Sequence, residues 1–196
     1  MPKIVDHKEQ RLQLSATVAE VVADAGLEHT TLRTVAARHG CTKGMVQHYF
    51  SDKDELLLAA INFVEDESAA RIAAAARGLS GLEELQARLV AQLPLDSALQ
   101  DEWRARLAFI TLAAQMPAIS DVLKESQAQQ QAQGLRLLRQ AQRSGSLRSG
   151  LSPLNCYRAL TLLVYGLGVA TVTGGGQWSP SVQKQLLKSA IHDLRS

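Results

Sequence analysis

Apolar residues recur at helical spacing along most of the chain, and no segment alternates in the two-residue pattern of a strand. The first stripe of apolar residues consists of Leu14, Val18, Val21, Val22 and Ala25. These positions lie on one face of an α-helix, which Gly26 should end. The pattern therefore predicts an amphipathic helix near the start of the sequence.

Two short helices joined by a tight turn should follow. Thr31 can cap the first and Gly40 can end it, while Thr42 can cap the second. Neither threonine has a Glu or Gln three residues later, so a full capping box is not expected. On the second short helix, Val46 and Phe50 are four residues apart and should face the interior.

Cap residues and prolines mark six longer helices further along. Ser51 and Asp52 give overlapping cap signals for a helix that should end near Arg77, and Ser80 with Glu83 has the spacing of another capping box. That second helix should end at Pro94. The others are expected at about residues 97–115, at 117–144, after Ser152-Pro153 and after Ser179-Pro180.

The composition favours the same fold class. Leu (30 residues) and Ala (28 residues), both strong helix formers, are abundant in this chain of 196 residues, whereas aromatic residues are only 4%. The hydrophobic share of 46% and the charged share of 20% are those of a globular chain with a core. We therefore expect an all-α protein of about nine helices.

Several protein classes are not expected. Apolar runs stay below the roughly 20 residues that span a bilayer, and the first ten residues lack the apolar stretch of a signal peptide. The sequence therefore predicts a cytoplasmic protein with no membrane partner. Cys41 and Cys156 have no metal-finger spacing, and we find no HExxH, GxSxG or phosphate-binding glycine motif. We expect no enzyme, no catalytic residues, no metal and no cofactor.

Charge is unevenly distributed, although the net charge is only +2. Residues 54–102 carry three basic and ten acidic groups, whereas residues 103–196 carry eleven basic and three acidic ones. The window 29–51 contains Arg33, Arg38 and Lys43 but no Asp or Glu. An acid-free stretch is typical of a surface that meets a polyanion, although a chance gap in a short window gives the same pattern.

The two short helices and their three-residue turn have the layout of a helix-turn-helix motif. The second helix of such a motif enters the major groove of DNA, so its outer face needs small or hydrogen-bonding residues. The outward residues predicted to face bases are Lys43, Gly44, Met45, Gln47 and His48. Among them Gln47 could pair with adenine, and Lys43 and His48 could reach guanine or phosphates.

The stretch from Thr31 to Leu57 resembles the DNA-binding domain of TetR-family transcriptional regulators. Its threonine caps, its turn, and its Lys-Gly and Tyr-Phe pairs have that family's spacing, and the match covers residues 8–58. The resemblance implies that phosphates of double-stranded DNA are held by Thr31, Thr42, Tyr49 and Lys53. It also implies a helix-turn-helix domain over residues 1–52 and a ligand-binding and dimerisation domain over residues 53–196.

The remainder more loosely resembles the regulatory domain of BetI-like members of that family. This resemblance rests on residues 102–109, the glutamine-rich long helix and Tyr165-Gly166-Leu167. It implies a pocket for a small-molecule effector among the middle helices and a homodimer formed by the last two. The candidate pocket residues are Trp103, Leu107, Ile110 and Ala114, which share one face of their helix, although such a stripe is more often core.

The residues themselves also predict a dimer. The segment 159–172 is apolar on every side of a helix, so one side can meet its own subunit while the other needs a partner. The predicted interface residues are Leu163, Gly166, Leu167, Ala170, Leu187, Ile191 and Leu194. Burial of this helix within a single chain is the alternative.

Together these patterns predict a homodimeric DNA-binding transcriptional regulator, a repressor of a palindromic operator that a small-molecule effector releases. The alternative is a helical small-molecule sensor or interaction protein whose DNA-binding end is vestigial. Salt-dependent retention of DNA would distinguish the two, because each neutralised phosphate steepens the salt dependence of binding.

Overall fold

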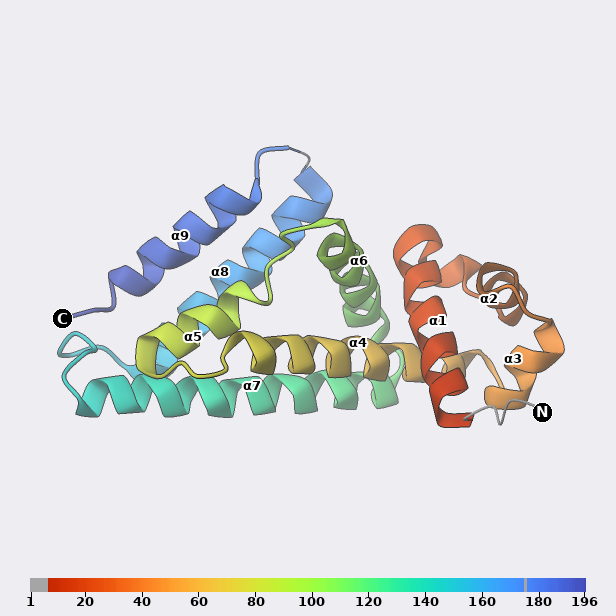
Figure 1. The fold of residues 1–196 in the computed structure, drawn as a ribbon, viewed down its shortest axis with the longest axis horizontal. Helices are drawn as coiled ribbons and strands as arrows, with labels where there is room; N and C mark the ends of the chain where they lie inside the picture. The colour runs from red at the N-terminus through yellow and green to blue at the C-terminus, as the bar shows by residue number, and fades with distance from the viewer. Residues whose placement is uncertain (1–6, 175) are drawn as a thin grey trace. The chain divides into compact units, whose positions relative to one another are not determined.

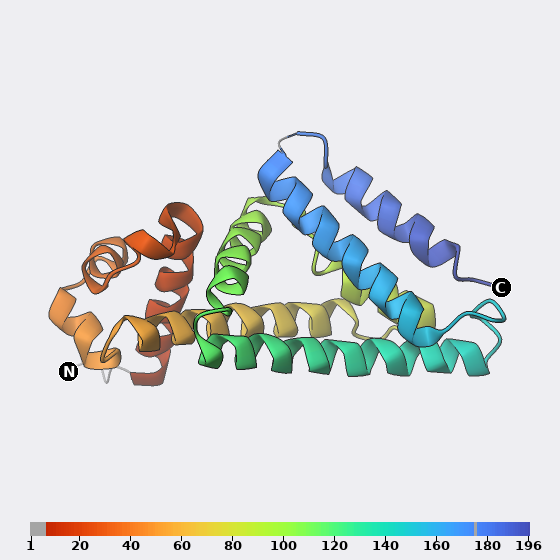
Figure 2. The same cartoon turned by 180° about the vertical axis from the view of Figure 1, so that it is seen from behind.

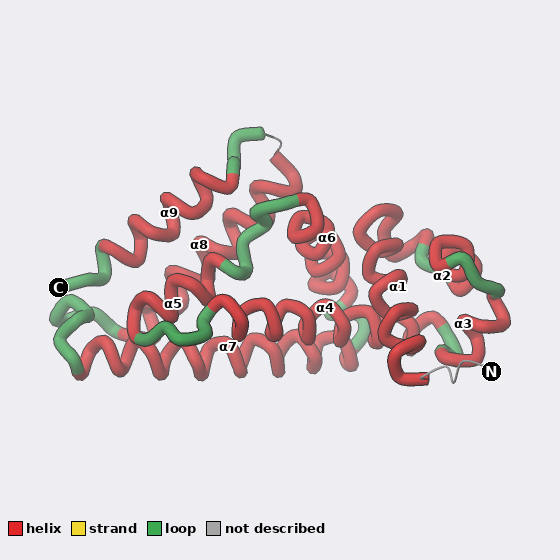
Figure 3. The backbone as a smooth tube through the Cα atoms, viewed as in Figure 1, coloured by secondary structure: helices red, strands yellow, loops and turns green. Residues whose placement is uncertain are grey.

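The computed structural model describes residues 7–174 and 176–196, and this part of the chain contains nine helices and no strand (Figures 1 and 3). The helices are α1 (His7–His29), α2 (Leu32–His39), α3 (Lys43–Tyr49), α4 (Lys53–Ala75), α5 (Gly81–Val90), α6 (Ser97–Leu112), α7 (Pro117–Arg143), α8 (Pro153–Gly174) and α9 (Pro180–His192). The all-α prediction is confirmed.

Glycine and threonine residues place the boundaries of the first three helices. Gly26 interrupts α1 with a φ of 79°, and Gly40 ends α2 with a φ of 75°. Backbone in this left-handed region favours glycine because a side chain would be strained there. Thr42 caps α3, with its hydroxyl oxygen accepting a hydrogen bond from the backbone N of Met45 at 3.2 Å.

Two predictions about helix caps were wrong. Helix α2 has a full capping box, in which Oγ1 of Thr31 accepts from the backbone N of Thr34 and Oγ1 of Thr34 accepts from the backbone N of Thr31. The short hydroxyl of Thr34 thus replaces the Glu or Gln that the motif usually uses. Conversely, Ser80 stands at the start of α5, but its side chain makes no capping hydrogen bond.

The chain packs into two compact units. The first combines the chain up to Glu67 with Asp101–Leu123, and the second combines Ser68–Gln100 with Lys124–Ser196. Helices α4, α6 and α7 each contribute residues to both units. The unit that holds the helix-turn-helix therefore also includes α6 from Asp101 onward and the start of α7.

One hydrophobic core holds the first unit together. Val46 and Phe50 are fully buried, as the sequence predicts, and they belong to the same cluster as Leu56 and Ile61 of α4. The cluster also includes Phe109 of α6. The helix that carries the predicted DNA-reading residues is therefore packed on a core shared with α4 and α6.

Helices α5, α8 and α9 pack together in the second unit, and α8 and α9 lie side by side in both views (Figures 1 and 2). Both begin at the proline of a Ser-Pro pair, as predicted. The fully buried Gln183 of α9 donates from Nε2 to the backbone O of Trp178 at 2.8 Å and to that of Pro94 at 3.4 Å. This side chain ties α9 to the segment that follows α5.

Helix α8 is longer than the apolar run that predicted it. It has 22 residues, and its most apolar window of 18 residues has a mean hydropathy of 1.3, so by length and composition alone it could cross a membrane. The apolar run itself, residues 159–172, is shorter than about 20 residues, as expected, and the helix reaches 22 residues because it extends beyond this run at both ends. A third of the window is buried inside this chain, and core helices of soluble proteins have similar composition.

Gly134 of α7 allows an aromatic ring to lie directly on the helix backbone. A Cβ atom at this position would lie 2.2 Å from Cε2 and 2.4 Å from Cδ2 of Tyr157 of α8, far closer than non-bonded carbon atoms approach. The ring is buried, and burial is the main cause that raises the pKa of Tyr157. The missing side chain at Gly134 sets how closely Tyr157 packs on α7.

We predict that Gly134→Ala lowers the free energy of unfolding by about 1–3 kcal/mol, because the added methyl group must displace the Tyr157 ring. Without such a clash, Gly→Ala inside a helix would raise stability by up to about 1 kcal/mol. Urea denaturation followed by circular dichroism measures the difference.

Gly44→Ala is the matched control, since the nearest atom to its Cβ position is Oγ1 of Thr42 at 3.9 Å. This variant should be at least as stable as the parent protein. A Gly134→Ala protein as stable as the Gly44→Ala protein would contradict the close packing of Tyr157 on α7.

Candidate DNA-binding surface

The five predicted base-facing residues lie on the side of α3 that faces away from the core. Four of them, Lys43, Gly44, Gln47 and His48, are exposed, and Met45 is half-buried. The two side chains that alternate with them, those of Val46 and Phe50, are fully buried. This face could therefore approach a groove in DNA without any loss of core packing.

Arg11 of α1 holds α3 against the start of α4. Its Nη1 donates to the backbone O of Tyr49, and its Nη2 forms an ion pair of 2.9 Å with Oε1 of Glu55. Its guanidinium carbon also lies 4.7 Å from the centre of the Phe50 ring. The sequence pattern gives no sign of this role, because the hydrogen-bond partners are 38 and 44 residues away in the chain.

The turn between α3 and α4 is stabilised by two carboxylates. Oε2 of Glu55 accepts a hydrogen bond from the backbone N of Ser51 at 2.8 Å, which is the main cause that lowers the pKa of Glu55, and the hydrogen bond from Arg11 adds to it. Asp52 accepts from the backbone N of Glu55 at 2.8 Å, and this bond is the main cause that lowers the pKa of Asp52. The predicted cap that pairs Asp52 with Glu55 is therefore present.

The predicted phosphate contacts are grouped around the starts of three helices. Thr31 and Thr42 are exposed and use their hydroxyl oxygens as N-caps of α2 and α3. Lys53 is the exposed first residue of α4, and its Nζ donates to the backbone O of Leu27 at 2.7 Å. An ammonium group has three N–H donors, so two remain for a phosphate oxygen.

Tyr49, the fourth predicted phosphate contact, belongs to a cluster of three rings. Its ring meets the ring of His48 edge-on at a centroid distance of 5.2 Å, and its hydroxyl lies 3.3 Å from Nδ1 of His7. The ring of His7 also lies 5.7 Å from that of His48. The half-buried Tyr49 therefore helps to set the direction in which His48 points.

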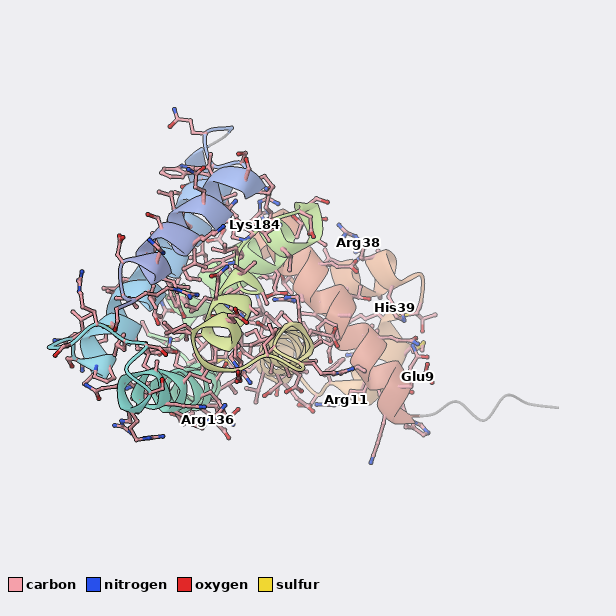
Figure 4. The ribbon with its side chains drawn as sticks, turned by 60° about the vertical axis from the view of Figure 1, so that its left-hand side comes forward. Glu9, Arg11, Arg38, His39, Arg136 and Lys184 are labelled. Atoms are coloured by element: carbon pink, nitrogen blue, oxygen red, sulfur yellow. The ribbon has the colours of Figure 1, made fainter. Side chains whose placement is uncertain are left out.

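Fewer basic groups are unpaired on this surface than the sequence suggests. Arg38 of α2, which is labelled in Figure 4, forms an ion pair of 2.7 Å with Asp24 of α1 and lies 3.8 Å from Glu20. Within the described part of the chain, Arg33 and Lys43 form no ion pair. The acid-free window thus meets carboxylates from α1, which a count along the sequence does not reveal.

The first unit also contains a buried ion pair on α6. Nε and Nη2 of Arg106 each lie 3.1 Å from Oε1 of Glu65 on α4, and Nη2 lies 3.7 Å from Oε1 of Glu102. The guanidinium carbon is 5.7 Å from the centre of the Trp103 ring. Removal of one partner of a buried pair is costly, so this contact fixes α6 on α4.

Two cavities lie within the second unit. The larger, of about 520 Å³, is lined by residues at the start of α5, the end of α7 and the last two positions of the sequence. The smaller, of about 20 Å³, is lined by residues of α4, α5, α7 and α8 and by Gln92, which follows α5.

Neither cavity is lined by the four predicted pocket residues. Trp103 is 2% exposed, Leu107 is half-buried, and Ile110 and Ala114 are exposed. Trp103, Leu107 and Ile110 lie in α6, whereas Ala114 follows its last residue, Leu112, and the four differ in burial. Their contact with a ligand stays a prediction.

The seven predicted interface residues fall into two groups. Leu167, Leu187 and Ile191 are buried in the chain's own core, whereas the other four are partly or fully exposed. Leu162, which is not among the seven, is 72% exposed, and Leu186 is 40% exposed. A run that is apolar on all sides does not show which side faces the core, so the pattern could not separate the two groups.

Models of known protein families match two parts of the chain. The family of bacterial regulatory proteins named tetR matches residues 14–60, and the family described as BetI-type transcriptional repressor, C-terminal, matches residues 81–196. The second match alone covers more than half of the sequence.

Two relatives carry regulator names. The HTH-type transcriptional regulator PksA of Bacillus subtilis (strain 168) is 32% identical over 114 residues, which are 58% of this chain and 56% of PksA. The HTH-type transcriptional regulator BetI of Burkholderia cenocepacia (strain HI2424) is 42% identical over 64 residues, or 33% of each protein. The matches thus span between a third and somewhat more than half of these relatives.

Solved structures resemble the chain over nearly its full length. A transcriptional regulator from Rhodococcus sp. Rha1 aligns with a TM-score of 0.83 and 26% identity, over 94% of this chain and 95% of that one. A protein from Saccharomonospora viridis, solved in complex with choline, aligns with a TM-score of 0.86 and 24% identity, over 94% of this chain and 96% of that one. At this identity the similarity concerns the fold alone. From the two family matches together, we conclude that this chain belongs to the TetR family of transcriptional regulators, with a helix-turn-helix DNA-binding domain and a BetI-type C-terminal region.

Proposed function

We propose that this TetR-family regulator is a homodimeric repressor, in which α3 of each subunit reads one half of a palindromic operator and a small-molecule effector releases the DNA. The observation that carries the proposal is the exposed outer face of α3 on a fully packed core. The name of the BetI-type family supports repression as the outcome.

The proposed DNA contacts divide by chemistry. Lys53, at the N-terminus of α4, combines an ammonium group with a helix end that favours anions, so it is proposed to hold a phosphate. Gln47 lies in the middle of α3 with an exposed amide, which could form two hydrogen bonds to an adenine edge. Phosphate contacts position the protein, whereas base contacts provide the sequence preference.

The proposed dimer uses the exposed side of α8 together with α9. Leu162, Val169 and Leu186 are each at least 40% exposed, which is unusual for large apolar side chains on two neighbouring helices. At Gly166, no atom other than the glycine, its chain neighbours and the nearby backbone of α8 lies within 4 Å of the position that a Cβ would occupy. A second copy related by a two-fold axis could cover this surface.

The proposed release by an effector uses the first unit's shared core. Phe109 of α6 lies in the same cluster as Phe50, and Arg106 fixes α6 to α4. A ligand that favours another position of α6 would therefore change the packing beneath α3. Trp103, Leu107, Ile110 and Ala114 stay the residues predicted to sense such a ligand.

For the dimer, we predict that Gly166→Arg produces a monomer. The open space at Gly166 accepts the side chain within one subunit, but at the proposed interface the charge would be buried without a partner, at a cost of several kcal/mol. Light scattering measures the mass, and circular dichroism checks that the helices are intact.

The control is Gln131→Arg, which adds the same charge at an exposed position of α7 and should leave the dimer unchanged. A dimeric Gly166→Arg protein that still binds DNA would show that the proposed interface is wrong.

For the DNA contacts, we predict that Lys53→Ala changes the salt dependence of binding, whereas Gln47→Ala changes the sequence preference. Lys53→Ala should weaken binding to all duplexes alike and make the plot of log affinity against log salt shallower by about 1 for each phosphate that is no longer neutralised, hence about 2 per dimer. Gln47→Ala should leave the slope almost unchanged and relax the preference at one position per half-site by about 1–3 kcal/mol.

Binding isotherms at two salt concentrations, on variants of a duplex selected from a random library, measure both effects. Arg139→Ala, which removes one positive charge from an exposed position of α7, is the control and should change neither. If Gln47→Ala weakens binding uniformly across all variants, the residue positions the protein and does not read a base. If the unmodified protein retains no DNA at low salt, the DNA-binding proposal fails.

A further inference from the structure

The smaller cavity of the second unit has an unusual charge distribution. Its apolar wall consists of Ile72 of α4 and Leu85 and Leu89 of α5. Of the nine residues that line it, Arg88 alone carries a formal charge. A partly buried site with one guanidinium and no carboxylate in its lining attracts an anion and repels a cation.

Arg88 is oriented by one neighbour while much of its hydrogen-bonding capacity stays unused. Its Nε donates to Oε1 of Glu84 at 2.9 Å, and its side chain is 23% exposed. Within the described part of the chain, Nη1 and Nη2 of Arg88 form no hydrogen bond. These two groups form one edge of a planar fork, which can bind a carboxylate through two parallel hydrogen bonds.

Glu84 does not cancel the positive charge near the cavity. The same oxygen, Oε1, also lies 3.3 Å from Nη2 of Arg136 on α7, which Figure 4 labels. One carboxylate is thus shared between two arginines, and the group of three keeps a net charge of +1. Arg136 is 54% exposed and does not line the cavity, so Arg88 is the member that presents this charge to it.

The cavity can enlarge by movement of one side chain. Its volume of about 20 Å³ is that of a site for a single water molecule, so a larger ligand must displace part of the lining. Tyr157 lines the cavity, and its ring lies on the bare backbone at Gly134. Movement of this ring away from Gly134 is therefore the change that we expect to enlarge the cavity.

We propose that this cavity, in place of the face of α6 that carries Trp103, is the effector site, and that the effector is a small carboxylate with a short apolar chain, held by the Nη groups of Arg88. The effector role rests on the proposed function, whereas binding of the carboxylate does not. A quaternary ammonium ion such as the choline of the Saccharomonospora viridis structure does not fit, because Tyr157 is the single aromatic residue in the lining and no carboxylate accompanies it.

Calorimetric titration of the full chain with hexanoate and with hexyltrimethylammonium tests the proposal. Hexanoate should bind at least tenfold more tightly than hexyltrimethylammonium. Arg88→Gln should weaken hexanoate binding at least tenfold, because it removes a charge-assisted pair of hydrogen bonds. Arg139→Gln, which removes one positive charge from an exposed position of α7 outside the cavity lining and away from Glu84, is the matched control and should bind hexanoate like the parent protein.

Equal hexanoate affinity of the Arg88→Gln and parent proteins, tighter binding of hexyltrimethylammonium, or no hexanoate binding up to about 10 mM would each overturn the proposal. If Arg88→Gln fails to fold, the parent protein is titrated with 1-hexanol as well as hexanoate. Equal affinity of the parent protein for the two ligands overturns the carboxylate assignment. Operator binding without ligand is measured on the same proteins. If the parent protein without ligand does not bind an operator, the proposed function is refuted but the carboxylate site is not. If hexanoate binds at Arg88 but leaves operator affinity unchanged, the effector role is overturned.

Discussion

The structure of the DNA-binding end depends on the complete burial of Val46 and Phe50. A seven-residue helix has little stability of its own, so α3 exists because these two side chains enter a core that α4 and α6 complete. The same burial turns Lys43, Gln47 and His48 outward. Anything that disturbs the packing of α6 therefore acts directly on the position of α3, the helix proposed to read DNA.

Ion pairs between distant segments then fix this arrangement. Arg11 joins α1, α3 and α4, and Arg106 joins α6 to α4 through Glu65. Both have a directional role that hydrophobic contacts lack, because a guanidinium bonds only along its plane. His39, labelled in Figure 4, adds a third link, with Nδ1 2.8 Å from Oγ1 of Thr17 and Nε2 3.0 Å from Nε2 of Gln10. This histidine belongs to the scaffold and not to the DNA-facing surface.

Local sequence signals predicted the helices well because caps, glycines and prolines act within a few residues. Thr42, Gly40 and the two Ser-Pro pairs each stand at a helix boundary of the structure. The sequence could not predict contacts that depend on folding, such as Arg11 with Glu55, or the side of α8 that faces the core. It also could not reveal Arg88 as a cavity residue, because that follows from the meeting of four helices. The helical stripe at Trp103 shows the same limit, since periodicity gives a face but not its surroundings.

The pairing of Arg38 with Asp24 and Glu20 has a consequence for how the protein finds its target. Non-specific affinity for DNA comes almost entirely from basic groups near phosphates, and a bacterial genome offers about a million competing sites. A basic residue already neutralised by α1 adds little to this background affinity. For the repressor proposed above, less protein would then be sequestered on unrelated DNA, so a small number of copies per cell would suffice to keep a single operator occupied.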